Sequence, residues 1–218
     1  MKRWIILLGI CLIYQMGYSQ YFGIKSNLLY DATLTINLGV EFALTDNLTL
    51  DISGNLNPWA FPQEKVSQAG IVTEQYDALI KHWMLQPELR WWTCEKFVGH
   101  FFGAHVHGGQ FNVGGLTFLP TGWSDGWADE KGKHQKGGLQ HNRHEGWMAG
   151  VGLAYGYHWI LNNRFSLEFS IGVGYTHLKY DKYTKYSEPK LTQKEPDRYM
   201  MHYFGITKAG MSLVYMLY

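Results

Sequence analysis

The chain has 218 residues, of which 16% are aromatic and 25 are glycine, and its 19 basic residues nearly balance 18 acidic ones. This length suits a single β-domain, and a chain without a basic excess is a poor partner for nucleic acid, because it has no surplus charge to neutralise phosphates. Of the two cysteines, only Cys94 lies beyond the predicted signal peptide, so we expect no internal disulfide in the mature chain.

Residues 1–19 predict a secretory signal peptide, and residues 20–218 a single mature domain. A basic start is followed by an apolar run, and the small residues Gly17 and Ser19 close the segment. This order is typical of secretory leaders, and the apolar run is shorter than the roughly 20 residues of a membrane-spanning helix. A lipid anchor on Cys11 is the less favoured alternative, because Cys11 lies inside the apolar run.

A two-residue period dominates the mature chain. In residues 164–176, every second side chain from Phe165 to Tyr175 is large and apolar, and the side chains between them are small or polar. Such alternation is typical of strands with one buried or lipid-facing side. The same alternation marks eight segments in all, at residues 22–30, 34–42, 48–56, 83–91, 102–107, 147–157, 164–176 and 208–215. The sequence therefore predicts an all-β fold of eight strands.

The connections between these segments differ in length. Tight turns rich in Asn and Asp are expected at 45–47, 94–96 and 162–164. Longer segments separate the other ends, at 58–81, 112–144 and 181–202, while 31–33 is short; within the first of these, residues 66–80 predict a short helix. Short periplasmic turns, longer outer loops and an even strand number are typical of an outer-membrane barrel.

Seven charged residues fall on the polar faces of the predicted strands. They are Lys25, Glu41, Asp51, Glu88, Arg90, Glu168 and Lys208. An eight-stranded barrel is just wide enough for side chains to fill it, and charges of both signs pair more readily inside it than in hydrocarbon. We expect these residues to form a charge network that plugs the lumen. A narrow gated ion conduit, in which the pairs exchange partners, is the alternative.

Aromatic residues gather near both ends of the predicted strands, as two girdles at membrane interfaces would require. One group comprises Phe42, Trp91, Phe97, Trp159, Phe165 and Tyr215, and the other comprises Tyr30, Trp59, Trp83, Trp147 and Tyr175. The competing interpretation is a soluble sandwich or lipocalin-like barrel with its apolar faces turned inward. The aromatic ends and the unequal loops favour the membrane barrel.

The last strand resembles the signal read by the outer-membrane assembly machinery. Lys208, Gly210, Leu213 and Tyr215 provide its polar, glycine and two hydrophobic positions. We therefore expect this machinery, outer-membrane lipid and lipopolysaccharide as partners of a monomeric barrel.

Candidate chemical sites are weaker. His105 and His107 share one strand face, and a long loop carries histidines and carboxylates that suit Zn or Cu but match no closed ligand set. That loop set is His134, His141, His144, Asp125, Asp129 and Glu130. An enzyme that modifies lipid A would need a Ser–His pair, such as His177 with Ser187 or His144 with Ser124, yet neither pair lies in a nucleophile motif. We expect no catalytic residues, metal or cofactor.

Several stretches resemble a family from Bacteroides-type bacteria that is catalogued as a domain of unknown function. They lie at residues 24–32, 50–59, 81–83, 86–90, 94–95, 99–103, 145–147 and 172–175. The resemblance implies an outer-membrane barrel that is sometimes encoded beside fimbrial components, and it supplies no catalytic residues. More distantly, the plan is similar to the OmpA-type eight-stranded barrel.

These observations predict an all-β, eight-stranded antiparallel up-and-down transmembrane β-barrel in the outer membrane of a Gram-negative bacterium. Its expected role is structural and non-enzymatic: anchoring or assisting a surface assembly through its outer loops, with a fimbrial association suggested by the resemblance alone.

Overall fold

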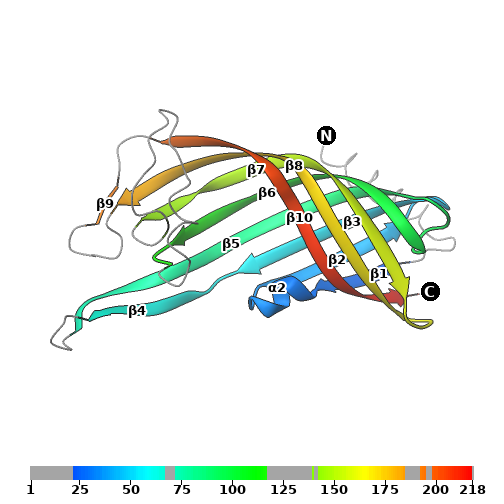
Figure 1. The fold of residues 1–218 in the computed structure, drawn as a ribbon, viewed down its shortest axis with the longest axis horizontal. Helices are drawn as coiled ribbons and strands as arrows, with labels where there is room; N and C mark the ends of the chain where they lie inside the picture. Colours follow the sequence, from blue (N-terminus) through cyan, green and yellow to red (C-terminus); the bar gives the residue numbers. More distant parts are fainter. Residues whose placement is uncertain are drawn as a thin grey trace, which may run out of the picture.

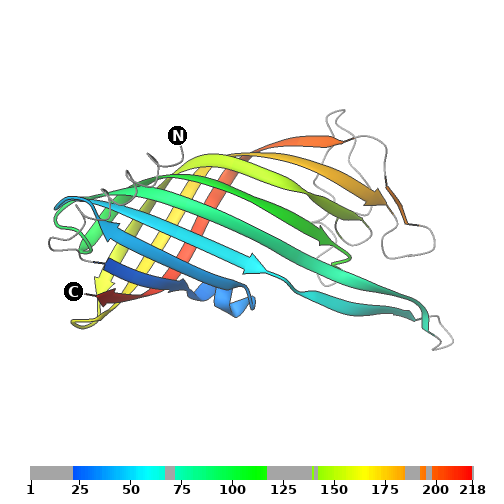
Figure 2. The same cartoon turned by 180° about the vertical axis from the view of Figure 1, so that it is seen from behind.

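The structure is a computed structural model that describes residues 22–66, 72–116, 139, 142–184, 192–194 and 198–217. The predicted signal peptide lies outside the described residues. Figures 1 and 2 show a long, tilted antiparallel sheet that curves round on itself.

Eight strands form a closed ring within the described part of the chain, in the order β10-β1-β2-β3-β5-β6-β7-β8, and β8 pairs back to β10. Their bounds are β1 Phe22–Asn27, β2 Ile36–Ala43, β3 Leu48–Asn57, β5 Val72–Trp92, β6 Gly99–Gly114, β7 Arg143–Ile160, β8 Phe165–Thr184 and β10 Tyr199–Leu217. Every pairing in the ring is antiparallel. The predicted eight-stranded, up-and-down barrel is confirmed.

Two further strands and one helix lie outside the ring order. β4 (Ala60–Val66) pairs with β5, β9 (Gln193–Lys194) pairs with β8, and the five-residue α2 (Leu28–Ala32) follows β1. Among the described residues, no helix is both long and apolar enough to cross a membrane.

The predicted tight turns are present. Leu44 N and Thr45 N both donate to Leu48 O, at 2.8 and 3.1 Å. At the turn 162–164, Asn162 accepts through Oδ1 from the backbone N–H groups of Arg164 and Phe165, each at 2.9 Å. These side-chain bonds supply acceptors for backbone N–H groups that a tight turn leaves without a backbone partner, as is usual for Asn in turns.

Two predicted elements are wrong. Of the segment 66–80, the described residues 72–80 form a strand and not a helix; β5 begins at Val72 and pairs along β4, so backbone ladder bonds outweigh the weak helical spacing. The first strand does not continue to Tyr30, because Asn27 accepts a hydrogen bond from Leu29 N and caps α2. The ends of the two other long connections also extend β6, β7, β8 and β10 beyond the predicted bounds.

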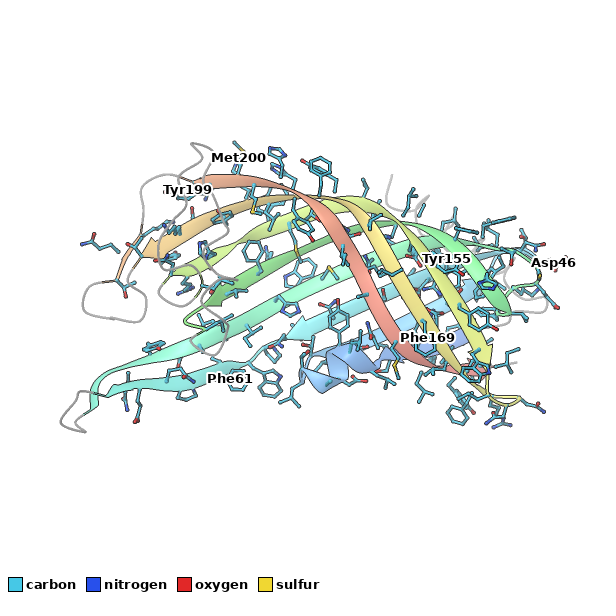
Figure 3. All side chains as sticks on the ribbon, viewed as in Figure 1. Asp46, Phe61, Tyr155, Phe169, Tyr199 and Met200 are labelled. Carbon is cyan, nitrogen blue, oxygen red and sulfur yellow. The ribbon has the colours of Figure 1, made fainter. Side chains whose placement is uncertain are left out.

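The outer surface of the barrel is apolar and the inner surface is largely polar, as predicted. On β7, Val151 is 55% and Leu153 67% exposed, while the neighbouring Ala154 is buried. Figure 3 shows side chains projecting all along the outside of the barrel, among them Tyr155 and Phe169. A water-soluble barrel has the opposite polarity.

An apolar cluster closes the interior near the short turns. It consists of Trp92, Phe97, Phe101, Val214 and Met216, all buried. Phe97 was predicted to belong to the outer girdle, but its left-handed backbone (φ 60°) turns it inward against Trp92, with ring centroids 5.8 Å apart. Phe101 lies on the lumen face as its register requires, and its ring packs on Trp92 at 4.9 Å.

Candidate functional site

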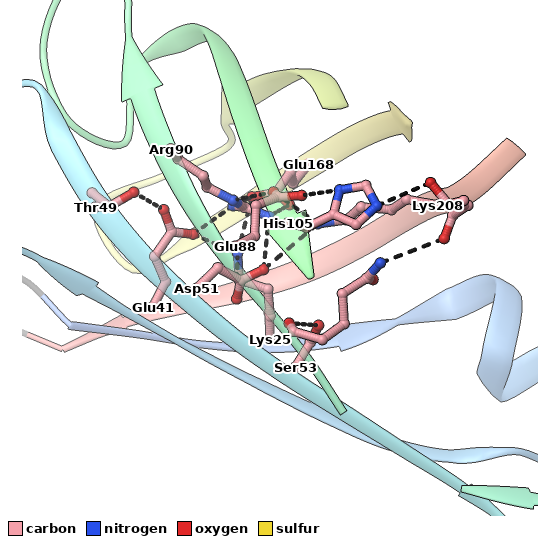
Figure 4. Close-up of polar contacts among 12 residues, drawn as sticks. Lys25, Glu41, Thr49, Asp51, Ser53, Glu88, Arg90, His105, Glu168 and Lys208 are labelled. Carbon is pink, nitrogen blue, oxygen red and sulfur yellow. Dashed lines mark hydrogen bonds and ion pairs between the residues drawn. The ribbon is translucent and has the colours of Figure 1, made fainter. Parts of the chain in front are cut away.

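Arg90 is the centre of the barrel interior. Its guanidinium is fully buried and donates to four carboxylates, which come from β2, β3, β5 and β8 (Figure 4). Nη1 lies 2.6 Å from Glu41 and 2.8 Å from Glu168, Nη2 lies 2.8 Å from Asp51, and Nε lies 2.8 Å from Glu88. The planar, permanently charged fork of arginine suits such multiple pairing.

Two lysines complete the predicted set. Lys25 on β1 lies 2.5 Å from Glu41, 3.2 Å from Glu168 and 3.5 Å from Asp51. Lys208 on β10 lies 2.8 Å from Glu88. The structure therefore brings all seven predicted charges into one network, which we call the ion cluster, and its pairs join strands from around the ring.

Neutral and titratable neighbours surround the ion cluster. Thr49 donates to Glu41 at 2.5 Å, His105 Nδ1 lies 3.4 Å from Glu88, and His158 Nδ1 lies 3.7 Å from Glu168. None of these three was included in the predicted network. Thr49 and His105 fall on the polar faces of their predicted strands, and His158 continues the polar face of its own strand. This was a usable signal, since facing residues on paired strands share one side of the sheet.

The ion cluster has four carboxylates and three lysine or arginine cations. Buried charges are stable only when they are paired and hydrogen-bonded, and removing one partner leaves an uncompensated charge. His105 and His158 lie beside the carboxylates of Glu88 and Glu168. The arrangement thus fits a static lock that fixes the strands against one another.

A polar cavity of about 40 Å³ lies against the ion cluster on the α2 side. Its lining includes Tyr30, Asn55, Gln86, Lys208 and Ser212. The side-chain oxygen of Asn55 is buried here without a protein partner. A polar space of this size holds a few water molecules, which would supply such partners.

The predicted assembly residues lie along β10. Lys208 and Gly210 face the interior, where Gly210 lines the cavity. Leu213 and Tyr215 face outward, and Tyr215 packs against Phe165 with ring centroids 5.2 Å apart. The side chains thus have the alternating polarity of the assembly signal.

The weaker candidate sites do not come together among the described residues. His107 bonds Thr176 at 2.8 Å inside the barrel, and His144 lies in β7 against Tyr180. His134, His141, Asp125, Asp129, Glu130, Ser124 and Ser187 lie outside the described residues. No group of three metal-ligating side chains is found in the part of the chain that is described. Cys94 is an exposed free thiol in its turn.

Comparison with known proteins gives a family without an assigned activity. No curated protein matches the chain. The family model described as "Protein of unknown function (DUF3575)" matches residues 4–217, nearly the whole length, and includes every strand of the ring. The chain therefore belongs to the DUF3575 family.

Proposed function

We propose that the chain is an outer-membrane barrel with a filled lumen, which acts without catalysis as an anchor or assembly aid at the cell surface. The observation that carries this proposal is that the outer side of the barrel wall is apolar and the inner side is charged. Large apolar side chains are exposed all round the outside, while the seven charges of the ion cluster are nearly inaccessible inside. Only an apolar surrounding makes this distribution favourable.

Aromatic side chains support two membrane interfaces. Trp91 and Trp159 are 53% and 56% exposed near the short turns, and Trp83 and Trp147 are 45% and 43% exposed towards the other end. Exposed tryptophans at two levels are typical of barrels whose apolar band lies between two girdles.

The long strands support a role outside the membrane. β5 has 21 residues and β8 has 20, whereas a bilayer is crossed by about 9–11 tilted residues. The described chain ends pair with each other, Phe22 with Leu217, at the end with the short turns. The opposite ends of the strands would then project from the cell surface, where they offer lipopolysaccharide or a surface protein a contact area.

The partners follow from this placement. The alternation along β10 suits recognition by the outer-membrane assembly machinery, and the exposed apolar band suits a monomer surrounded by lipid and lipopolysaccharide. A fimbrial partner is supported only by the sequence resemblance given above.

The test is fractionation followed by electrophoresis with and without heating. The proposal predicts a band in the outer-membrane fraction that runs faster before heating than after it, because the barrel stays folded in detergent. A periplasmic, heat-insensitive protein would contradict the proposal.

A gated ion conduit is the second candidate, favoured by the polar cavity beside the ion cluster. Below the ion cluster, the buried rings of Trp92 and Phe101 fill the interior, which favours the closed form. Recording in planar bilayers distinguishes the two, since a filled lumen predicts no current steps and a conduit predicts steps that change when Lys25 is replaced by Met.

A further inference from the structure

The hydrogen-bonded wall of the barrel is interrupted on the side of α2. β1 ends at Asn27, opposite Ser212, whereas β10 continues to Tyr199. Within the described residues, β10 above Ser212 pairs with β8 alone, and β4 pairs with β5 alone. Figure 1 shows β10 and β4 diverging on either side of α2. We call the interruption between β10, α2 and β4 the wall gap.

Side chains, and not a neighbouring strand, satisfy the backbone of β10 at the lower edge of the wall gap. Asn27 donates to Ala209 O at 3.2 Å and accepts from Met211 N at 3.3 Å. Gln86 donates to Thr207 O at 3.4 Å. Unpaired backbone groups are costly in hydrocarbon, so a strand edge there must find partners. Over residues 207–211 the edge therefore offers no regular ladder to a strand from a second copy.

Tyr203 lies beside the wall gap, on the lumen side of β10. It pairs with Thr176, whose hydroxyl bonds His107 within the barrel, and paired residues share one face of a sheet. Thr176 and His107 are each 6% exposed, yet Tyr203 is 38% exposed. A lumen-facing ring is thus accessible at the place where the wall, as far as the chain is described, lacks a strand.

The outer rim of the wall gap is apolar. Phe204 on β10 is 76% exposed and Ile206 is 58% exposed, while Leu34 beyond α2 is 64% exposed. Leu34 adopts a left-handed backbone (φ 56°), which is strained for a residue other than glycine. Trp59 Nε1 donates to Leu34 O at 2.6 Å and holds this conformation. The exposed leucine at the rim is therefore maintained against backbone strain.

The inner wall carries the hydrogen-bonded pair Thr176 and His107 beside Tyr203, and it is apolar further along β10, towards Tyr199. Phe111, Leu178 and Tyr180 are buried together, and Met201 and Tyr199 of β10 pack against them. Apolar surface thus lies on the outer rim of the wall gap and, inside the barrel, around Met201 and Tyr199, above the ion cluster.

We propose that the wall gap is a docking position for one hydrocarbon chain of a lipid in the outer leaflet. The inference rests on the proposed function, because it requires the apolar band to lie in a bilayer. A hydrocarbon chain needs no hydrogen bonds, so it complements an edge on which Thr207 O, Ala209 O and Met211 N already have side-chain partners. The ion cluster closes the interior below, so the chain docks beside Tyr203 and does not pass through the barrel.

Nitroxide accessibility tests this proposal. In a Cys94→Ser background, Tyr203→Cys reports on the wall gap and Val151→Cys reports on the outward face of β7, where Val151 is 55% exposed. Each labelled variant is folded into phosphatidylcholine vesicles and checked for heat-modifiable migration. Collisions with oxygen report hydrocarbon, and collisions with a nickel chelate report water. Met201→Cys replaces Tyr203→Cys if the latter does not fold.

The proposal predicts that the label at 203 matches the label at 151, with frequent oxygen and rare nickel collisions. Frequent nickel collisions at 203 alone would mean a water-filled gap and would overturn the proposal. Rare collisions with both reagents at 203 would mean that protein, from this chain or a second copy, covers the gap, which also overturns it. Frequent nickel collisions at 151 would contradict the membrane location itself, and with it this inference.

Discussion

Arg90 links four strands through one side chain. Its carboxylate partners belong to β2, β3, β5 and β8, and Phe101 lies beneath the guanidinium at 4.4 Å from the ring centroid. No other side chain offers this many fixed donors, so lysine is not an equivalent replacement.

Replacing Arg90 by Met should reduce the free energy of unfolding by about 3–5 kcal/mol, because Glu41, Asp51, Glu88 and Glu168 would lose a shared buried partner. Denaturant titration of the protein in lipid vesicles measures the change. Arg143→Met is the control, since Arg143 pairs with the half-exposed Glu145 and should cost about 1 kcal/mol or less. Equal losses in the two variants would refute the central role of Arg90.

Gly156 is required by the close approach of the Phe101 ring. A Cβ at this position would overlap that ring and would lie 2.7 Å from Phe169 O. Gly156→Ala should therefore destabilise the barrel by about 1–3 kcal/mol, as overpacking of a filled interior does. Gly108→Ala is the control, because its Cβ would meet only Met148 O at an ordinary 3.7 Å. If thermal unfolding shows the same stability for both variants, the inner cluster is looser than described.

The charged residues of the interior were predictable, but the apolar inner residues were not. Lys25, Glu88 and Arg90 stand out because each is charged and falls on the polar face of a segment whose other face is apolar. Val214 and Met216 follow Leu213 in an unbroken apolar run, where period two no longer distinguishes the inner from the outer face. Such runs leave the register to tertiary packing.

At the scale of elements, α2 ends the first strand and braces the wall gap. Asp31 accepts from Ser26 at 2.8 Å and from Asn37 at 2.7 Å, so β1, α2 and β2 are joined by side chains. Asn27 caps α2 and bonds the edge of β10. These bonds join β1, α2 and β2 to one another and to the last strand, which alternation alone cannot predict.

Asn27→Ala should expose the edge of β10. The loss of a helix cap alone costs about 0.5–2 kcal/mol, and Met211 N would lose its partner as well. Hydrogen exchange should therefore accelerate at Met211, while the amide of Leu153 in β7 should stay protected. Ser26→Ala is the control, since it removes the bond to Asp31 and leaves the bonds to β10. Unchanged exchange at Met211 would show that the side chain of Asn27 does not protect this edge.

The strand lengths were underestimated from the sequence for a physical reason. Beyond the apolar band, β5, β7 and β8 continue with polar residues on both faces, as at Glu145 and Asp181. Polar strands in water show no alternation of polarity, so their pairing comes from backbone bonds that a hydropathy pattern does not report.

At the scale of the whole molecule, the orientation of the barrel depends on which end carries the short turns. Cys94 is exposed in one of these turns. A membrane-impermeant maleimide should leave it unlabelled in intact cells and should label it once the outer membrane is permeabilised. Lys194→Cys in a Cys94→Ser background should show labelling in intact cells, because β9 lies at the opposite end. The reverse pattern would invert the proposed orientation.

The most direct test of the account is the free energy of folding of Leu153→Arg in lipid vesicles. Leu153 is 67% exposed in the middle of the apolar band, and Leu161 is 53% exposed beside a short turn. If the band lies in hydrocarbon, arginine at 153 should cost about 2–4 kcal/mol and arginine at 161 about 0–1 kcal/mol. If the outer face met water, an exposed leucine could become arginine at either position with little loss, and equal, small effects at 153 and 161 would contradict the membrane barrel.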